Sequence, residues 1–292
     1  MSDRFSFPQP RVIRVVAPAG PVNEGDLARG MDLLRDQGFT VEVAPHVLRR
    51  DGYLAGPDEV RLLDLQDALD DPAVDLLWFA RGGYGTTRLL GRLTAERLSR
   101  NPKLLVGFSD ATALFAWASR LPNVRCLYAP SVQELAREGV CQLSPLWEAI
   151  RGEAVSIPGE GPSEPWGPFL ITGGCLTLCS VSVGTSWEPE VEGHWLFLED
   201  VGEPLYRIDR MLTHLAQVGW LKGCAGLLLG GFTGLGEGES YDSVVARSRT
   251  LLGPLKPIVS GLPVGHLKGK YPLPLGTRAL WDRHVLCVER QY

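Results

Sequence analysis

The segment LLVGFSDATALFAWA, residues 104–118, places a serine at the point where a short apolar run gives way to a helical pattern. Such a change of period predicts a strand that turns directly into a helix. Ser109 stands at this junction, with Gly107 two residues before it and Ala111 two residues after it. Small residues at these positions let the backbone crowd closely, as a nucleophile elbow requires. We interpret Ser109 as a candidate nucleophile; in the alternative interpretation, Ser109 or Asp110 only caps the helix.

A serine nucleophile needs a base, and the chain has five histidines. His266 lies in PIVSGLPVGHLKGKYPLPLG, a loop rich in glycine and proline, and such loops carry functional side chains when a scaffold positions them. A solvated loop histidine is the alternative. The other four are expected to be structural: a surface loop residue, two residues at strand starts and one helix side chain, namely His46, His194, His284 and His214.

The base in turn needs an orienting carboxylate. Glu199 is the first candidate, because the segment WLFLED carries an apolar strand directly into two acids. Ligand sites of open α/β sheets lie at the carboxyl ends of strands. Asp200 and Glu203 compete with Glu199, and one of these acids could simply cap the helix expected from Leu205.

Acyl transfer also requires donors for the developing oxyanion. The backbone N–H of Asp110, directly after the serine, is the natural first donor. The sequence RGGYG, residues 81–85, follows a predicted strand, and its glycines can turn N–H groups inward to supply the second. This stretch lacks the Lys-Ser/Thr ending of a P-loop and the spacing of a dinucleotide fingerprint.

The elements that must position these groups alternate along the first half of the chain. We predict strands at residues 12–16, 40–43, 74–80 and 104–106, and helices at 24–37, 58–69 and 86–98. Repeated strand-then-helix units indicate a mostly parallel sheet with helices on both faces. The fold class is therefore α/β.

The second half is less regular. Residues 156–168, SIPGEGPSEPWGP, are dense in proline and glycine and are interpreted as a linker. We expect strands at 194–198, 226–229, near 258 and at 284–288, and helices at 173–184, 205–218 and 243–252. This predicts an N-terminal nucleophile-bearing domain, residues 1–160, and a smaller mixed α/β C-terminal domain, residues 161–292.

Composition excludes several classes of protein. The net charge is −5 at pH 7, so no basic field for nucleic acid is expected. The first twenty residues contain charges and prolines where a signal peptide needs an apolar core, and no stretch reaches membrane-spanning length, which predicts a cytoplasmic protein. The six cysteines lack CxxC pairs, which favours reduced core thiols over disulfides or a metal site.

Five ordered segments resemble the L,D-carboxypeptidases, the muramoyltetrapeptide carboxypeptidase family of serine peptidases, which also includes the microcin C immunity peptidases. The resemblance runs from about Val12 to the C-terminus. The segments are ARGGYG at 80–85, VGFSDAT at 106–112, GG-x-L at 173–176, FLEDVGEPLYRIDRMLTHL at 197–215, and LPVGH followed by PLPLG at 262–276.

The resemblance implies a Ser109–Glu199–His266 triad, with backbone N–H groups of Gly83 and Asp110 as the oxyanion hole. It implies a site between the two domains, a homodimer, and chemistry that needs neither metal nor cofactor. The implied reaction releases the terminal D-Ala from murein tetrapeptide during cytoplasmic cell-wall recycling, through an acyl-enzyme.

The substrate is less well determined than the reaction. Arg81, Tyr84 and Trp187 are candidates for substrate contact. Two departures from the family pattern bear on substrate preference: Cys175 stands where the family usually has Asn, and Tyr128-Ala129-Pro130 stands where it commonly has His-Gly-Pro. A microcin-type immunity peptidase or another small-peptide carboxypeptidase is therefore the alternative.

Two rival classes of protein remain. A non-enzymatic peptide-binding module would tolerate loss of any triad residue. An α/β-hydrolase esterase shares the Ser-acid-His order but predicts a single domain.

Overall fold

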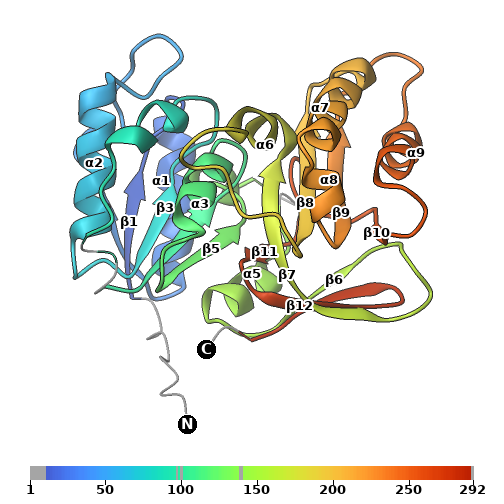
Figure 1. Cartoon of the computed structure of the whole chain (residues 1–292). Helices are drawn as coiled ribbons and strands as arrows, with labels where there is room; N and C mark the ends of the chain where they lie inside the picture. The colour runs from blue at the N-terminus through green and yellow to red at the C-terminus, as the bar shows by residue number, and fades with distance from the viewer. Residues whose placement is uncertain (1–10, 97, 99–100, 138–140, 291–292) are drawn as a thin grey trace.

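The computed structural model describes residues 11–96, 98, 101–137 and 141–290. Its elements form two β-sheets with helices packed around them (Figure 1). This two-domain arrangement confirms the predicted α/β class. No helix in these described ranges is long and apolar enough to cross a membrane.

The first sheet has six strands among the described residues, in the order β11-β5-β4-β3-β1-β2. The five N-terminal strands are parallel, and β11 pairs antiparallel with β5. Both β3 and β4 are buried along their whole length, as expected for parallel strands covered on both faces. The strands are β1 (Val12–Val16), β2 (Thr40–Val43), β3 (Leu76–Phe79), β4 (Lys103–Gly107), β5 (Val124–Tyr128) and β11 (Leu273–Leu275).

Helices α1 (Glu24–Asp36) and α2 (Asp58–Asp70) cover this sheet. The chain moves from β1 to β2 in one direction and from β2 across β1 to β3 in the other. Right-handed crossovers therefore place α1 and α2 on opposite faces, as predicted (Figure 1). The remaining helices of this half are α3 (Ala111–Ala118), α4 (Val132–Leu135) and α5 (Leu143–Ile150).

The prediction of a single helix at residues 86–98 is wrong. The chain forms two short 3₁₀ helices instead, η1 (Thr86–Arg88) and η2 (Leu90–Arg92). It then becomes extended at Leu93, where ψ is 143°. Apolar spacing alone suggested a continuous helix, but Gly91 weakens helical propensity in the middle of the segment.

The second sheet has seven described strands, in the order β10-β9-β8-β7-β12-β13-β6. Strands β7 to β10 are parallel, whereas β12, β13 and β6 are antiparallel. The strands are β6 (Val155–Pro158), β7 (Trp166–Cys175), β8 (Trp195–Val201), β9 (Gly226–Thr233), β10 (Ile258–Val259), β12 (Arg278–Asp282) and β13 (Val285–Val288). The helices of this half are α6 (Leu176–Ser182), α7 (Leu205–Gln217), α8 (Trp220–Gly223) and α9 (Tyr241–Leu252). This half is mixed α/β as expected, although its sheet is no smaller than the first.

The predicted linker at residues 156–168 is partly regular structure. Most of β6 and the start of β7 lie inside it, and β6 pairs with β13. Proline and glycine density hid a four-residue strand that alternates buried and exposed side chains. Strands β6 to β10 belong to the second sheet, β11 to the first, and β12 and β13 to the second, so the chain crosses between the sheets three times. The division at residues 160 and 161 into two folding units stays a prediction.

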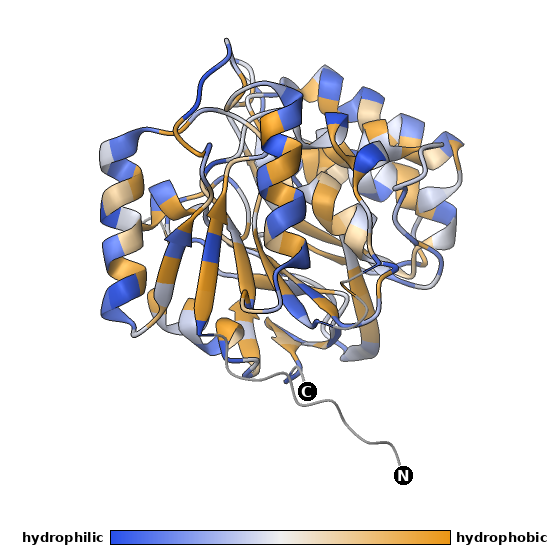
Figure 2. Ribbon diagram, turned by 90° about the vertical axis from the view of Figure 1, so that its left-hand side faces the viewer, coloured by the Kyte–Doolittle hydropathy of each residue, from blue (hydrophilic) through white to orange (hydrophobic). Residues whose placement is uncertain are grey.

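A single cluster of buried apolar side chains runs from the first sheet onto one face of the second, and it includes Ile13, Leu105, Phe197 and Trp281. A second cluster packs α7 against the other face of the second sheet. Figure 2 shows strands that are mostly hydrophobic and helices that are hydrophobic on part of their circumference. Because close-packed interiors resist deformation, the ends of β4 and β8 are held in a fixed relation.

Candidate active site

Ser109 occupies a strained turn between β4 and α3. Its φ is +60°, a left-handed conformation that costs a non-glycine residue about 1–2 kcal/mol. A Cβ on Gly107 would lie 2.9 Å from Ala111 Cβ and 3.1 Å from Phe79 Cβ, so only glycine fits there. The predicted strand-to-helix turn with small residues on both sides of the serine is therefore present.

The glycine loop at residues 81–85 lies against Ser109. A Cβ on Gly82 would approach Ser109 Oγ to 3.3 Å. The buried Asp110 carboxylate accepts a hydrogen bond of 2.9 Å from the Thr86 N–H, and so ties this loop to the turn. Burial raises the pKa of the Asp110 carboxyl.

Glu199 and His266 form a buried pair. Glu199 is fully buried in β8, next to a shift in the pairing of β8 with β9, and such irregularities re-aim side chains. Its Oε2 atom lies 2.7 Å from His266 Nδ1 and accepts a hydrogen bond of 3.0 Å from the His266 backbone N–H. The carboxylate therefore holds both the ring and the main chain of His266.

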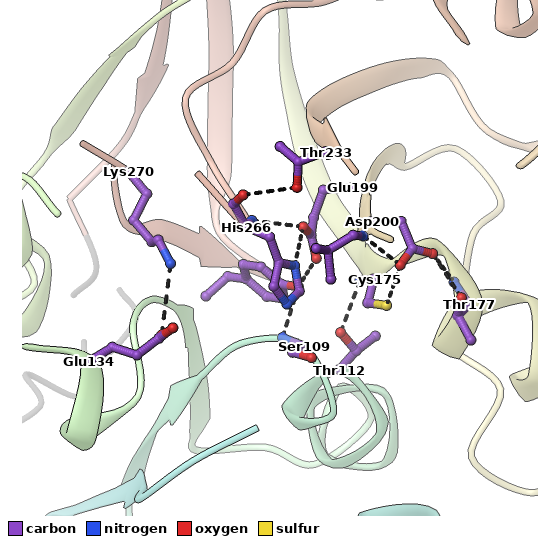
Figure 3. Close-up of polar contacts among 12 residues, drawn as sticks. Ser109, Thr112, Glu134, Cys175, Thr177, Glu199, Asp200, Thr233, His266 and Lys270 are labelled. Carbon is purple, nitrogen blue, oxygen red and sulfur yellow. Dashed lines mark hydrogen bonds and ion pairs between the residues drawn. The ribbon is translucent and has the colours of Figure 1, made fainter. Parts of the chain in front are cut away.

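This pairing fixes what the imidazole can do. When Nδ1 donates its proton to Glu199, Nε2 carries the free lone pair and can accept a proton. In Figure 3 the ring of His266 lies between the carboxylate of Glu199 and Ser109, with its far edge toward Ser109. The ring centroids of His266 and Phe108, the neighbour of Ser109, are 4.7 Å apart.

Among the described residues, no hydrogen bond joins Ser109 Oγ to His266. Hydrogen bonds of this kind are often long in the absence of substrate and tighten in the complex. The arrangement brings a strained serine and a carboxylate-bound imidazole into one region, and it leaves the last contact open.

Tyr128 was not predicted to belong to this site. Its hydroxyl accepts a hydrogen bond of 3.0 Å from the Ser109 N–H and donates one of 2.6 Å to Glu199 Oε1. Burial, followed by the charge of Glu199, raises the pKa of Tyr128 well above its usual value. The sequence offered one signal, the departure from the family pattern at this position, and it was interpreted only as a question of substrate.

The two rival carboxylates have other partners. Asp200 accepts hydrogen bonds from the backbone N–H and the hydroxyl of Thr177, at 2.9 and 2.8 Å, and burial raises its pKa. It therefore holds the start of α6 (Figure 3). Glu203 precedes α7 and lies 3.4 Å from Arg207 in the first turn of that helix. Glu199 is the one of the three that contacts His266.

The other histidines lie outside this region. His46 was expected to be a surface loop residue, but it is half-buried and its Nδ1 lies 2.7 Å from Asp64. The spacing of His46 from Asp64 along the chain gave no sign of this pair. His194 Nδ1 lies 2.9 Å from the Glu192 carbonyl oxygen.

The three predicted substrate-contact residues are not brought together. Arg81 is exposed on the glycine loop and donates to the Pro21 carbonyl oxygen at 2.5 Å. Tyr84, on the same loop, is half-exposed beside Tyr53. Trp187 lines a cavity of about 390 Å³ whose lining includes Thr112 but none of Ser109, Glu199 and His266.

Cys175 is the last residue of β7 and lies where this strand meets α3. Its backbone N–H donates to Thr112 Oγ1 at 3.0 Å, and a Cβ on Gly174 would lie 2.4 Å from the same oxygen. The end of β7 therefore rests directly on α3, one turn after the serine. In the described part of the chain, no cluster of three or more His, Cys, Asp or Glu side chains could hold a metal ion.

Known proteins match both halves of the chain. Residues 13–129 match the model of the LD-carboxypeptidase N-terminal domain, and residues 170–280 match that of the LD-carboxypeptidase C-terminal domain. A putative carboxypeptidase of Streptomyces coelicolor is 41% identical over 285 residues, covering 92% of this chain and 90% of that protein.

Two further relatives have names that state a substrate. The murein tetrapeptide carboxypeptidase of Pseudomonas aeruginosa is 30% identical over 300 residues, covering 98% of this chain and 97% of that protein. The crystal structure of muramoyltetrapeptide carboxypeptidase from Oxalobacter formigenes superimposes with a TM-score of 0.84 at 30% identity, covering 95% of this chain and 98% of the other.

Proposed function

The chain belongs to the LD-carboxypeptidase family of hydrolases, and we propose that it is a serine carboxypeptidase whose triad is Ser109, Glu199 and His266. The observation that carries this proposal is the buried Glu199 carboxylate, 2.7 Å from His266 Nδ1, beside a serine held at a φ of +60°. A carboxylate that fixes one tautomer and a serine on a strained turn are the parts that this chemistry requires.

In the proposed reaction, His266 Nε2 takes the proton of Ser109 as its Oγ attacks the peptide carbonyl. The tetrahedral intermediate collapses, the C–N bond breaks, and the leaving amine departs with the proton from His266. Water then attacks the acyl-enzyme, with His266 again as base; the ester bond to Ser109 Oγ breaks, and His266 returns the proton to that oxygen. Glu199 stabilises the imidazolium in both halves of the reaction.

We propose the backbone N–H groups of Gly83 and Asp110 as the oxyanion hole. Neither N–H donates to another residue in the described ranges, so both are available to a substrate. The contact of Gly82 with Ser109 supports this placement, as does the hydrogen bond from Thr86 to Asp110. Removing one such donor costs about 10²- to 10³-fold in kcat.

We propose murein tetrapeptide as the substrate, with its terminal D-Ala as the leaving group, in cytoplasmic recycling of the cell wall. The substrates named for the relatives from Pseudomonas aeruginosa and Oxalobacter formigenes support this choice. Arg81 and Tyr84, on the loop that carries Gly83, would contact the peptide, with the Arg81 guanidinium facing its carboxylate. Trp187 has no part in this proposal because the cavity that it lines includes no triad residue. We also propose a homodimer.

The test is release of D-Ala from purified murein tetrapeptide, measured by mass spectrometry. Wild type is expected to turn the peptide over, and Ser109→Ala, with the same fold by circular dichroism, is expected to lose several orders of magnitude in kcat. A peptidyl nucleotide serves as the second substrate. Turnover of the nucleotide alone would reject the murein substrate, and turnover of the tetrapeptide by Ser109→Ala would reject the triad.

A further inference from the structure

We propose that Tyr128 is a positioning residue for this reaction, whose hydroxyl fixes the nucleophile turn and the orienting carboxylate relative to each other. The inference rests on the triad proposed above. It assigns a role to a buried side chain that takes no part in the proton transfers or bond changes of the proposed reaction.

The position of Tyr128 follows from the first sheet. It is the last residue of β5 and pairs with Gly107, the last residue of β4, immediately before the turn that carries Ser109. Its side chain is 1% exposed. The ring is surrounded by three others, with centroids 6.2 Å from Phe108, 6.3 Å from Phe115 and 5.4 Å from Phe197. This packing restricts the ring, and therefore its hydroxyl, to one place.

The backbone N–H of Ser109 needs a hydrogen-bond acceptor, and the Tyr128 hydroxyl is placed to provide it. At a φ of +60°, Ser109 has left the regular geometry of β4, and its N–H cannot continue the ladder of the sheet. The Ser109 N–H is partly buried, so leaving it without a partner would cost free energy; the Tyr128 oxygen accepts its hydrogen bond at 3.0 Å. The hydroxyl therefore supports the conformation that presents Ser109 Oγ.

The orienting carboxylate needs a donor at the same place. Glu199 Oε2 contacts His266 through Nδ1 and the backbone N–H, and Tyr128 donates to the other oxygen, Oε1, at 2.6 Å. With both oxygens engaged, the carboxylate cannot rotate about its terminal bond without losing a hydrogen bond. Tyr128 keeps its proton for this bond because burial and the Glu199 charge raise its pKa.

One oxygen atom thus connects two segments that are 90 residues apart along the chain. The connection runs from the Ser109 N–H through the Tyr128 hydroxyl to Glu199, and from Glu199 to His266. Without the Tyr128 hydroxyl, the ring would still pack in the same place. No hydrogen-bonded group would then link the turn of Ser109 to the carboxylate that holds His266. Misplacement of reacting groups by about 1 Å costs up to about 10²-fold in rate.

The experiment compares Tyr128→Phe with a matched packing variant, Phe115→Leu, in the full-length protein. The first removes the hydroxyl and keeps the ring; the second keeps the hydroxyl and replaces one of the three neighbouring rings, while Phe108 and Phe197 still hold the ring of Tyr128. Tyr128→Phe is expected to lower kcat by at least about tenfold, with KM within about twofold of wild type, because the proposed role is positioning rather than binding. Phe115→Leu is expected to keep kcat within about threefold of wild type.

A fluorophosphonate probe provides a readout that is independent of the peptide. Its rate of reaction with Ser109 is expected to fall in Tyr128→Phe by at least the same tenfold, and to stay near the wild-type rate in Phe115→Leu. A smaller fall in Tyr128→Phe, or an equal fall in both variants, would overturn the role of Tyr128. Loss of probe labelling and of peptide turnover in wild type would overturn the triad instead, so the two failures can be told apart.

If Tyr128→Phe does not fold, the hydroxyl can be observed directly in wild type. We expect a slowly exchanging NMR signal from the Tyr128 hydroxyl proton, with a nuclear Overhauser effect to the Ser109 amide proton. Rapid exchange of that proton with water, or an effect to neither Ser109 nor Glu199, would contradict the proposal.

Discussion

The backbone at Gly265 passes so close to Glu199 that a Cβ on the glycine would lie 2.3 Å from Oε2 of the carboxylate. Gly265 also has a φ of +104°, which side chains rarely permit. This approach is what lets the next residue, His266, place its N–H and its Nδ1 on the same oxygen. The glycine is therefore part of how the imidazole is held.

We expect Gly265→Ala to separate His266 from Glu199 and to lower kcat by about 10²-fold or more, since the added methyl group occupies the space of the carboxylate. The matched control is Gly261→Ala in the same loop. Gly261 also has a positive φ, +65°, but a Cβ there meets only Glu160 Cγ at 3.9 Å. The control should lose stability and keep kcat, as measured by urea unfolding and D-Ala release. Equal loss of activity in both variants would show that backbone strain, rather than the contact with Glu199, is responsible.

The left-handed φ of Ser109 should lower the stability of the protein, although the serine itself is required for activity. Ser109→Gly and Ser109→Ala both remove the hydroxyl and should both be inactive. Because glycine adopts a φ of +60° freely, Ser109→Gly should unfold with a free energy about 1 kcal/mol higher than Ser109→Ala. Urea denaturation measures the difference. An alanine variant as stable as the glycine variant would mean that the turn carries no strain.

The choice of Glu199 over Asp200 is testable by a pair of isosteric changes. Glu199→Gln should lower kcat by about 10⁴-fold, as loss of the orienting charge does in a serine triad. Asp200→Asn should act on stability, because Asp200 holds Thr177 at the start of α6. Steady-state kinetics and thermal unfolding of both variants separate the two roles. A larger loss of kcat in Asp200→Asn would reverse the assignment.

Lys270 predicts a specific dependence of stability on pH. Its Nζ lies over the ring of Phe108, 4.3 Å from the centroid, and 3.8 Å from Glu134. Burial lowers its pKa from the usual 10.5 despite Glu134. Between the lowered pKa and 10.5, the unfolded chain binds more protons than the folded chain, so the stability of wild type rises with pH through this interval.

We therefore expect the stability of wild type relative to Lys270→Met to increase as the pH is raised toward 10.5. Urea unfolding at several pH values measures this difference. Lys268→Met is the control, since Lys268 is exposed in the same loop. A flat difference for Lys270→Met, or one that falls with pH, would contradict the burial of its ammonium group as the cause.

Much of the fold could be predicted because period and composition are local signals. The alternation of β1, α1, β2, α2 and β3 is visible in the sequence, as are the turn at Ser109 and the helix α7. Local signals failed where tertiary pairing decides the structure. Strand β6 exists because β13 lies beside it, and β11 joins the first sheet from the far end of the chain. In both cases the two paired strands lie too far apart in the sequence for a local pattern to predict their pairing.

For the site as well, only the residues with a local sequence signal could be predicted. Ser109, Glu199 and His266 each have a local signature: a strand-to-helix junction, acids at the end of an apolar strand, and a histidine in a glycine-rich loop. Tyr128 has none, because its role depends on a hydroxyl that meets two segments far away in the sequence. The pairing of His46 with Asp64 was missed for the same reason.

The central claim is that His266 and Glu199 activate Ser109 as a nucleophile. The most direct measurement is the site of covalent labelling by a fluorophosphonate, located by peptide mapping in wild type, His266→Ala and Ser109→Ala. The account predicts one adduct on Ser109 in wild type, labelling slowed by orders of magnitude in His266→Ala, and none in Ser109→Ala. An adduct on another residue, or equally fast labelling of Ser109 without His266, would contradict it.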